Sequence, residues 1–221
     1  MGLSEEFLNN INIKKCKWAN DKLELFDLGK FQKFKYFITK YSKTNQKILL
    51  SSIVGTDHFS YGNKETWLSM LSNGKRIEKN LRSYLDKPNF FENHDKYNYP
   101  HNLSYSTIND SDYYISGSGN HRTIIAKFVF AEQPNKYLNG VNITYHKINY
   151  DFYNAYQELK SFCKNTTKFD TYSELKDNVS SVVIINKSNN DRLKLHNENE
   201  IKYFLSQKNT TLSKIRRFLG Y

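Results

Sequence analysis

One short segment, residues 116–123 (SGSGNHRT), constrains the fold of this 221-residue chain more than any other. It lies between a strand-like run, Tyr113-Tyr114-Ile115, and a helix-like run from Ile124 to Phe130. Two glycines let backbone N–H groups approach an anion closely. The first turn of a following helix adds unpaired N–H donors and the positive end of the helix dipole. The segment therefore predicts a strand, a tight turn and a helix start, arranged as in phosphate-binding loops.

Hydrophobic patterns along the rest of the chain predict both helices and strands. The first forty residues are expected to be helical, because Leu28, Phe31, Phe34, Ile38 and Tyr41 recur every three or four positions. Before the glycine-rich turn we expect a buried strand over 48–55, helices over 65–71 and 76–85, a loop over 89–99, and a hairpin of 103–108 with 113–116. After it we expect a helix to about 133, a strand over 141–148, a helix capped by Asp151 and ending near Cys163, a hairpin of 182–185 with 192–195, and two C-terminal helices.

This order of elements predicts an α+β fold with a small mixed β-sheet flanked by helices. Residues 1–46 are expected to form a helical N-terminal extension, and residues 47–150 the core around the sheet. Residues 151–221 are expected to form a C-terminal α/β extension packed on that core.

The net charge of +11 comes mainly from the two ends of the chain. Residues 1–50 hold ten lysines against five acids, and residues 201–221 hold five basic residues and no acid. Lys214, Arg216 and Arg217, on an expected last helix, are the best candidates for contacting DNA phosphates. The alternative is a solvated, lysine-rich surface that reflects an AT-rich coding sequence.

Other sequence features favour a protein of the cytoplasm without a membrane segment. No apolar run approaches the roughly 18 residues that a membrane span needs, and the acidic amino terminus lacks a secretion signal. Cys16 and Cys163 are expected to be free thiols. The cysteines and histidines lack the spacing of a metal site, so no resident metal is expected.

The box Gly119-Asn120-His121-Arg122-Thr123, with a hairpin before it and a helix after it, resembles the Gly-x-His-Arg box of the ParB/sulfiredoxin superfamily. The resemblance covers about residues 47–150 and implies a ParB/sulfiredoxin-like core whose glycine-rich turn binds nucleotide phosphates. For ATP or CTP, with Mg²⁺ as an accompanying cation, the resemblance implies Gly119, Asn120, His121, Arg122 and Thr123 as binding residues. Gly117 and Ser118, from the same glycine-rich turn, complete the expected nucleotide site.

The resemblance leaves the activity open between an ATPase, a phosphotransferase, a nuclease and a nucleotide-controlled DNA-binding protein. Sulfinic acid reduction is not expected, because position 120 is Asn where sulfiredoxin has its reactive Cys. His121 and Arg122 are the expected catalytic residues of the turn. Asp57, just after the first strand, is the leading candidate for a base or a metal-holding acid. The alternative for Asp57 is that it caps the following segment.

A second hypothesis belongs to a different class of protein. The chain would be a DNA-binding or interaction protein of a mobile element or phage, acting through its basic ends, with the glycine-rich turn only structural. An AMP-transfer site of Fic type is not expected, because Tyr113-Tyr114-Ile115 stands where that motif has His-Pro-Phe. The sequence leaves open the base of the nucleotide, the second substrate and the oligomeric state.

Overall fold

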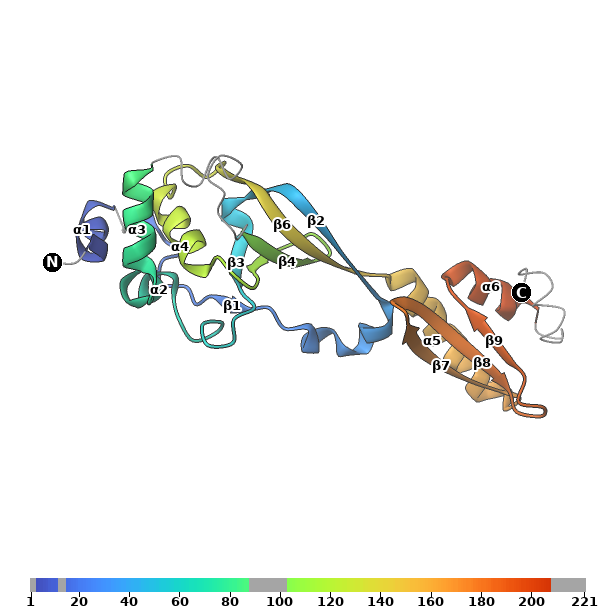
Figure 1. Cartoon of the computed structure of the whole chain (residues 1–221). Coiled ribbons are helices and arrows are strands. Elements are labelled where there is room, and N and C mark those ends of the chain that lie inside the picture. The colour runs from blue at the N-terminus through green and yellow to red at the C-terminus, as the bar shows by residue number, and fades with distance from the viewer. Residues whose placement is uncertain (1–2, 12–14, 88–102, 208–221) are drawn as a thin grey trace. The chain divides into compact units, whose positions relative to one another are not determined.

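The computed structural model describes residues 3–11, 15–87 and 103–207, and it confirms the predicted α+β class (Figure 1). The chain divides into two compact units: residues 1–30 with 40–146, called unit 1 below, and residues 31–39 with 147–221, called unit 2. The elements in chain order are α1 (Leu3–Asn10), β1 (Glu24–Leu25), the 3-10 helix η2 (Leu28–Phe37), β2 (Ile38–Leu49), the 3-10 helix η3 (Leu50–Ser52), β3 (Ile53–Thr56), α2 (Trp67–Asn73), α3 (Ile77–Asp86), β4 (Ser104–Ile108), β5 (Tyr113–Ile115), α4 (Asn120–Val129), β6 (Tyr137–Ile148), α5 (Tyr150–Thr166), β7 (Phe169–Lys176), β8 (Val179–Asn186), β9 (Arg192–Leu195) and α6 (Glu198–Ser206).

Unit 1 is built on a mixed six-stranded sheet in the order β1-β3-β5-β4-β6-β2. β3 lies between β1 and β5 and is parallel to both. β4 is antiparallel to β5, as the predicted hairpin requires, and parallel to β6. Because β3 and β5 run in the same direction, the segments that follow them leave the sheet at the same edge.

Four helices of unit 1 gather beside this sheet, with α4 in contact with both α2 and α3 (Figure 1). Every residue of α4 from Thr123 to Phe128 is buried. The apolar residues of this run join a core that includes Ile53, Leu71 and Tyr105. Because six consecutive residues are buried, this helix is covered on all its faces, and α4 is the central helix of the unit.

Unit 2 combines α5 and α6 with an antiparallel sheet of order β7-β8-β9. Phe37, from the end of η2, packs on α5, with ring centroids 5.2 Å from Phe152 and 5.4 Å from Tyr156. Phe37 and both partners are buried in a second core that is formed with β8, β9 and α6.

The helical prediction for the first forty residues is confirmed only for α1 and η2. It is wrong at Glu24–Leu25, which form β1, and from Ile38 onward. The aromatic stripe ends with η2, a 3-10 helix with non-helical dihedral angles at Phe31, and residues 38–49 form β2. β2 lies next to β6 at one edge of the sheet. Pairing with a distant strand therefore overrides the local helical spacing.

The single strand predicted over 48–55 is interrupted by η3. Ser52 Oγ donates a hydrogen bond to the Leu49 carbonyl at 2.6 Å, which favours a local turn over an extended ladder. Residues 48 and 49 instead end β2.

Two further differences fall in unit 2. The N-cap of α5 is Asn149, whose side chain accepts a hydrogen bond from the Phe152 N–H, and Asp151 lies in the first turn instead. Strand β7, which the sequence does not predict, is a largely polar edge strand. The predicted loop over 89–99 and the second C-terminal helix lie outside the described residues.

The helix pair α2 and α3 and both predicted hairpins are confirmed. α4 ends at Val129, four residues before the predicted end. Within the described ranges, no helix combines the length and the apolar character needed to cross a membrane.

Candidate functional site

The parallel pairing of β3 with β5 places Asp57 beside the glycine-rich turn. Thr56 pairs with Ile115, and the Asp57 N–H donates to the Ile115 carbonyl at 2.9 Å. The Thr56 hydroxyl donates to the same carbonyl at 3.2 Å and accepts from the His58 N–H at 3.0 Å. The backbone after β3 is thus held against the end of β5, where the turn begins.

The turn itself depends on two glycines with positive φ angles. Gly117 has φ of 64° and Gly119 has φ of 122°, a conformation that residues with side chains rarely adopt. Gly119 is the N-cap of α4, and having no side chain it cannot cap the helix. The start of α4 therefore presents backbone N–H donors without a capping oxygen from residue 119.

Asp57 already places a negative charge on this turn. The Gly117 N–H hydrogen-bonds to the Asp57 carboxylate, and this bond, together with the nearby His58, lowers its pKa. Partial burial has the larger, opposite effect, so the pKa of Asp57 lies above its usual range. The Gly117 N–H thus favours the anion at this turn, although burial outweighs that effect for Asp57 itself.

His121 lies in the first turn of α4 and is half-buried. Burial, the positive charge of Arg76 and the proximity of His58 lower its pKa, which favours the neutral imidazole. Its Nε2 atom is buried without a hydrogen-bond partner among the described residues. Tyr61 links the two histidines, since it stacks on His58 with centroids 4.3 Å apart and meets the His121 ring edge-on at 6.1 Å.

The sequence does not single out Tyr61 or Arg76. A turn places Tyr61 close to His58, and in this turn the Tyr61 N–H donates to the His58 carbonyl at 2.9 Å. Arg76 is the residue before α3. A histidine followed by an aromatic residue three positions later was the available signal for Tyr61, whereas no local pattern indicates Arg76, which reaches His121 only through the tertiary fold.

The remaining residues of the predicted box differ in how far they are exposed. Gly117 and Ser118 are exposed, Arg122 is half-buried, and Asn120 is only 5% exposed, with its Oδ1 unpartnered within the described part of the chain. Thr123 is fully buried, and its hydroxyl is hydrogen-bonded to that of Tyr105 at 2.8 Å. Thr123 therefore attaches α4 to β4 in this structure.

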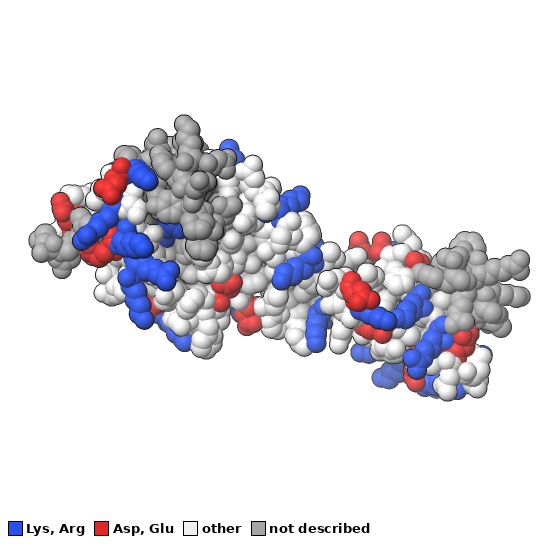
Figure 2. All heavy atoms as spheres, in the orientation of Figure 1, with Lys and Arg blue, Asp and Glu red and all other residues white. Residues whose placement is uncertain are grey.

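Charged side chains of both signs are scattered over the face shown in Figure 2, and lysine and arginine side chains gather over α2 and α3. Exposed basic residues of that region are Lys75, Arg76, Lys79 and Arg82. Arg76 belongs to this basic region, and its positive charge is one of the causes of the lowered pKa of His121. Lys214, Arg216 and Arg217, the predicted DNA contacts, lie outside the described residues.

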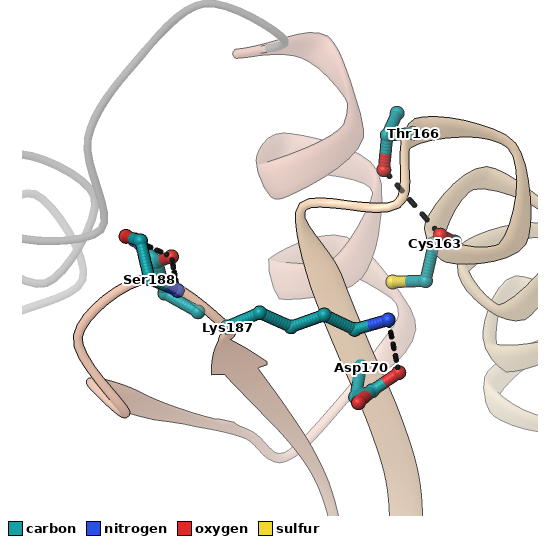
Figure 3. Close-up of polar contacts among 6 residues, drawn as sticks. Cys163, Thr166, Asp170, Lys187 and Ser188 are labelled. Atoms are coloured by element: carbon teal, nitrogen blue, oxygen red, sulfur yellow. Dashed lines mark hydrogen bonds and ion pairs between the residues drawn. The ribbon is translucent and has the colours of Figure 1, made fainter.

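Cys163, in unit 2, is not suited to act as a nucleophile. Burial and the charge of Asp170 raise the pKa of the Cys163 thiol to about 11, so the thiolate is disfavoured. Lys187, beside it, forms an ion pair with Asp170 at 3.1 Å, and the Ser188 hydroxyl donates to the Asn186 side chain (Figure 3). Lys187 and Ser188 therefore already have partners in Asp170 and Asn186.

Across residues 3–11, 15–87 and 103–207, no three His, Cys, Asp or Glu side chains form a metal-binding group. A comparison of the chain with models of protein families, with curated proteins and with solved structures finds no match. The ParB/sulfiredoxin resemblance therefore stays a prediction from the sequence, and a functional proposal has to rest on the geometry around the turn.

The two glycines of the turn should differ in how far they tolerate alanine. A Cβ at Gly119 would lie 2.8 Å from the Leu103 Cδ2 atom, whereas a Cβ at Gly117 would meet nothing within 4 Å. We expect Gly117→Ala to lower the free energy of unfolding by about 1 kcal/mol through backbone strain alone, and Gly119→Ala by about 2 to 3 kcal/mol. Urea denaturation measures both, and equal losses would contradict this geometry.

His121 should make the stability depend on pH. Its folded-state pKa lies below the value of about 6.5 of an unfolded chain, so the unfolded state binds more protons and stability falls as the pH drops below neutral. We expect His121→Gln to lose less stability than wild type between pH 7.5 and 5.5, as measured by urea denaturation at each pH.

His146 gives an internal comparison for this experiment, because burial lowers its pKa as well. The double variant His121→Gln/His146→Gln should therefore show a flatter pH profile than either single variant. A profile for His121→Gln that parallels wild type would show that His121 does not titrate in this way.

Proposed function

We propose that unit 1 binds the phosphates of a nucleoside triphosphate, ATP or CTP, at the turn of residues 117–123. One observation carries the proposal: the Gly117 N–H binds the carboxylate of Asp57 at a start of α4 that Gly119 cannot cap, beside a buried His121 Nε2 that has no partner in the described ranges. Backbone donors at a helix start, with a glycine that allows close approach, are suited to phosphate oxygens. The unpartnered atom is a second sign of a missing ligand.

Each residue of the turn has a role in this proposal that follows from its position. The N–H groups of the turn and of the first turn of α4 bind phosphate oxygens, and Arg122 contributes its guanidinium fork. His121, neutral at pH 7, donates from Nε2. Arg76 adds positive charge beside His121, where the outer phosphates would lie.

Asp57 has a role distinct from binding. Its raised pKa and its place beside the turn suit a proton acceptor for an attacking hydroxyl or water. The same carboxylate fits a nucleotide-bound Mg²⁺, which proteins usually hold with one or two carboxylates and the phosphates themselves. Either role favours phosphoryl transfer or nucleotide hydrolysis, in the cytoplasm, over a turn that is only structural.

Arg122→Ala should remove most of the stabilisation that a nucleotide gives to the wild-type chain. A charge-assisted, forked contact contributes about 1.5 to 3 kcal/mol, so nucleotide affinity should fall about tenfold or more. The measurement is the melting-temperature shift with ATP, CTP, GTP and UTP, each with and without Mg²⁺. Arg192→Ala, an exposed residue of unit 2, is the control and should bind as wild type does.

The nucleotide proposal has two clear negative outcomes. A wild-type chain whose melting temperature responds to none of the four nucleotides would refute it. Equal shifts for wild type and Arg122→Ala would place the nucleotide elsewhere. Arg122→Lys, which keeps the charge but loses the fork, separates geometry from charge and should give an intermediate affinity.

Asp57→Asn should separate binding from turnover. Replacing the carboxylate by a neutral amide removes its repulsion of the phosphates, so affinity for the nucleotide without Mg²⁺ should rise several-fold. Phosphate release, measured with the nucleotide that gives the largest thermal shift, should fall at least tenfold if Asp57 is the proton acceptor. Unchanged release would assign Asp57 the capping role instead.

A further inference from the structure

A separate pocket lies near the other end of α4, away from the glycine-rich turn. It encloses about 390 Å³ and is lined by residues from the segment before β1, from η3 and β3, and from α2 and α4. Trp18, Trp67 and Phe130 supply aromatic surface, and Ile53 is aliphatic. Its volume and largely apolar lining are those of small-molecule sites in general.

Lys127 gives this pocket a buried charge that has no ion-pair partner within the described part of the chain. The residue is only 8% exposed, and no carboxylate of the described chain lies within ion-pairing distance of its Nζ. Lysine is rarely buried to this degree unless it is paired. Among the described residues, Asp21 acts on this cation only at a distance and forms no ion pair with it, so a bound anion would stabilise the buried charge.

The contacts that Lys127 does make orient its ammonium group. Nζ donates to the Ile53 carbonyl at 2.6 Å, and it lies 4.2 Å from the Trp67 ring centroid and 5.1 Å from that of Trp18. Burial lowers the pKa of Lys127 to about 8, against the smaller opposing effect of Asp21. The amine is thus still largely protonated at neutral pH, beside two aromatic surfaces.

Three exposed charged residues complete the lining on the segment before and within β1. They are Asp21, Lys22 and Glu24. Glu24 already accepts a hydrogen bond from the Tyr114 hydroxyl at 2.9 Å. Since these residues are exposed while Lys127 is buried, the desolvated part of the pocket is aromatic and cationic.

From this arrangement we propose that the pocket binds a small aromatic carboxylate, whose ring lies against Trp18 and Trp67 and whose carboxylate pairs with Lys127 Nζ. The carboxylate supplies an ion-pair partner, which Lys127 does not have among the described residues, and a planar apolar ring is complementary to the indole surfaces. This site is distinct from the turn at residues 117–123 and does not depend on nucleotide binding there.

Intrinsic fluorescence gives a direct test, because the chain has only two tryptophans and both line this pocket. The full-length protein is titrated with benzoate, benzamide and benzylamine, which share a ring and differ in charge. Benzoate should change the tryptophan emission saturably and bind at least tenfold more tightly than either of the others, as expected when one charged hydrogen bond is lost.

Variants of the protein identify the group responsible for this preference. Lys127→Met keeps the length of the side chain and removes its charge, and it should abolish the preference for benzoate over benzamide. Arg192→Ala in unit 2 serves as the control and should keep that preference.

Three results would overturn the proposal: no saturable response to benzoate, equal affinity for benzoate and benzamide, or an unaltered preference in Lys127→Met. The first two come from the wild-type protein alone, so the test stands even where the variant does not fold. The nucleotide titrations are read out separately by melting temperature and by Arg122→Ala.

Discussion

The parallel pairing of β3 with β5 is the constraint on which the candidate site of unit 1 depends. It aligns Thr56 with Ile115, so that the chain after β3 and the glycine-rich turn after β5 leave the sheet together. Asp57 and Gly117 are 60 positions apart in sequence and become hydrogen-bonded only through this register. Moving β3 by one residue would direct its side chains to the other face of the sheet and separate the two groups.

The sequence predicts the parts of this site better than the interactions among them. The turn and the start of α4 follow from local chemistry, because two glycines before a hydrophobic run favour a tight strand-to-helix connection. The position of Asp57 depends on an expectation that its strand pairs near the turn, and the structure has that pairing. Arg76 carries no local signal, and the only one for Tyr61 is its position three residues after His58. The proximity of both to His121 arises from the packing of α3 and of the segment after β3.

The errors in the predicted fold have a common physical origin. The stripe from Leu28 to Tyr41 fits helical spacing, yet residues 38–49 pair with the sheet and extend as β2. β7 was missed because its pattern is mostly polar, as suits an edge strand whose partner β8 supplies the apolar face. In both cases pairing with a strand that is distant in the sequence decides the conformation, and the pattern of neighbouring residues does not predict that pairing.

The unfavourable features of unit 1 converge on α4. Two glycines with positive φ lie before it. Considering only the residues that the structure describes, Asn120 Oδ1 and His121 Nε2 in its first turn have no hydrogen-bond partner, and Lys127 near its end is buried without an ion pair. The middle of the helix is fixed by complete burial and by the bond between Thr123 and Tyr105. A helix held this firmly cannot relieve strain at its ends by moving. Strain and unsatisfied polar groups that persist in a well-packed element are characteristic of binding sites, which is why both proposed ligands are placed on this one helix.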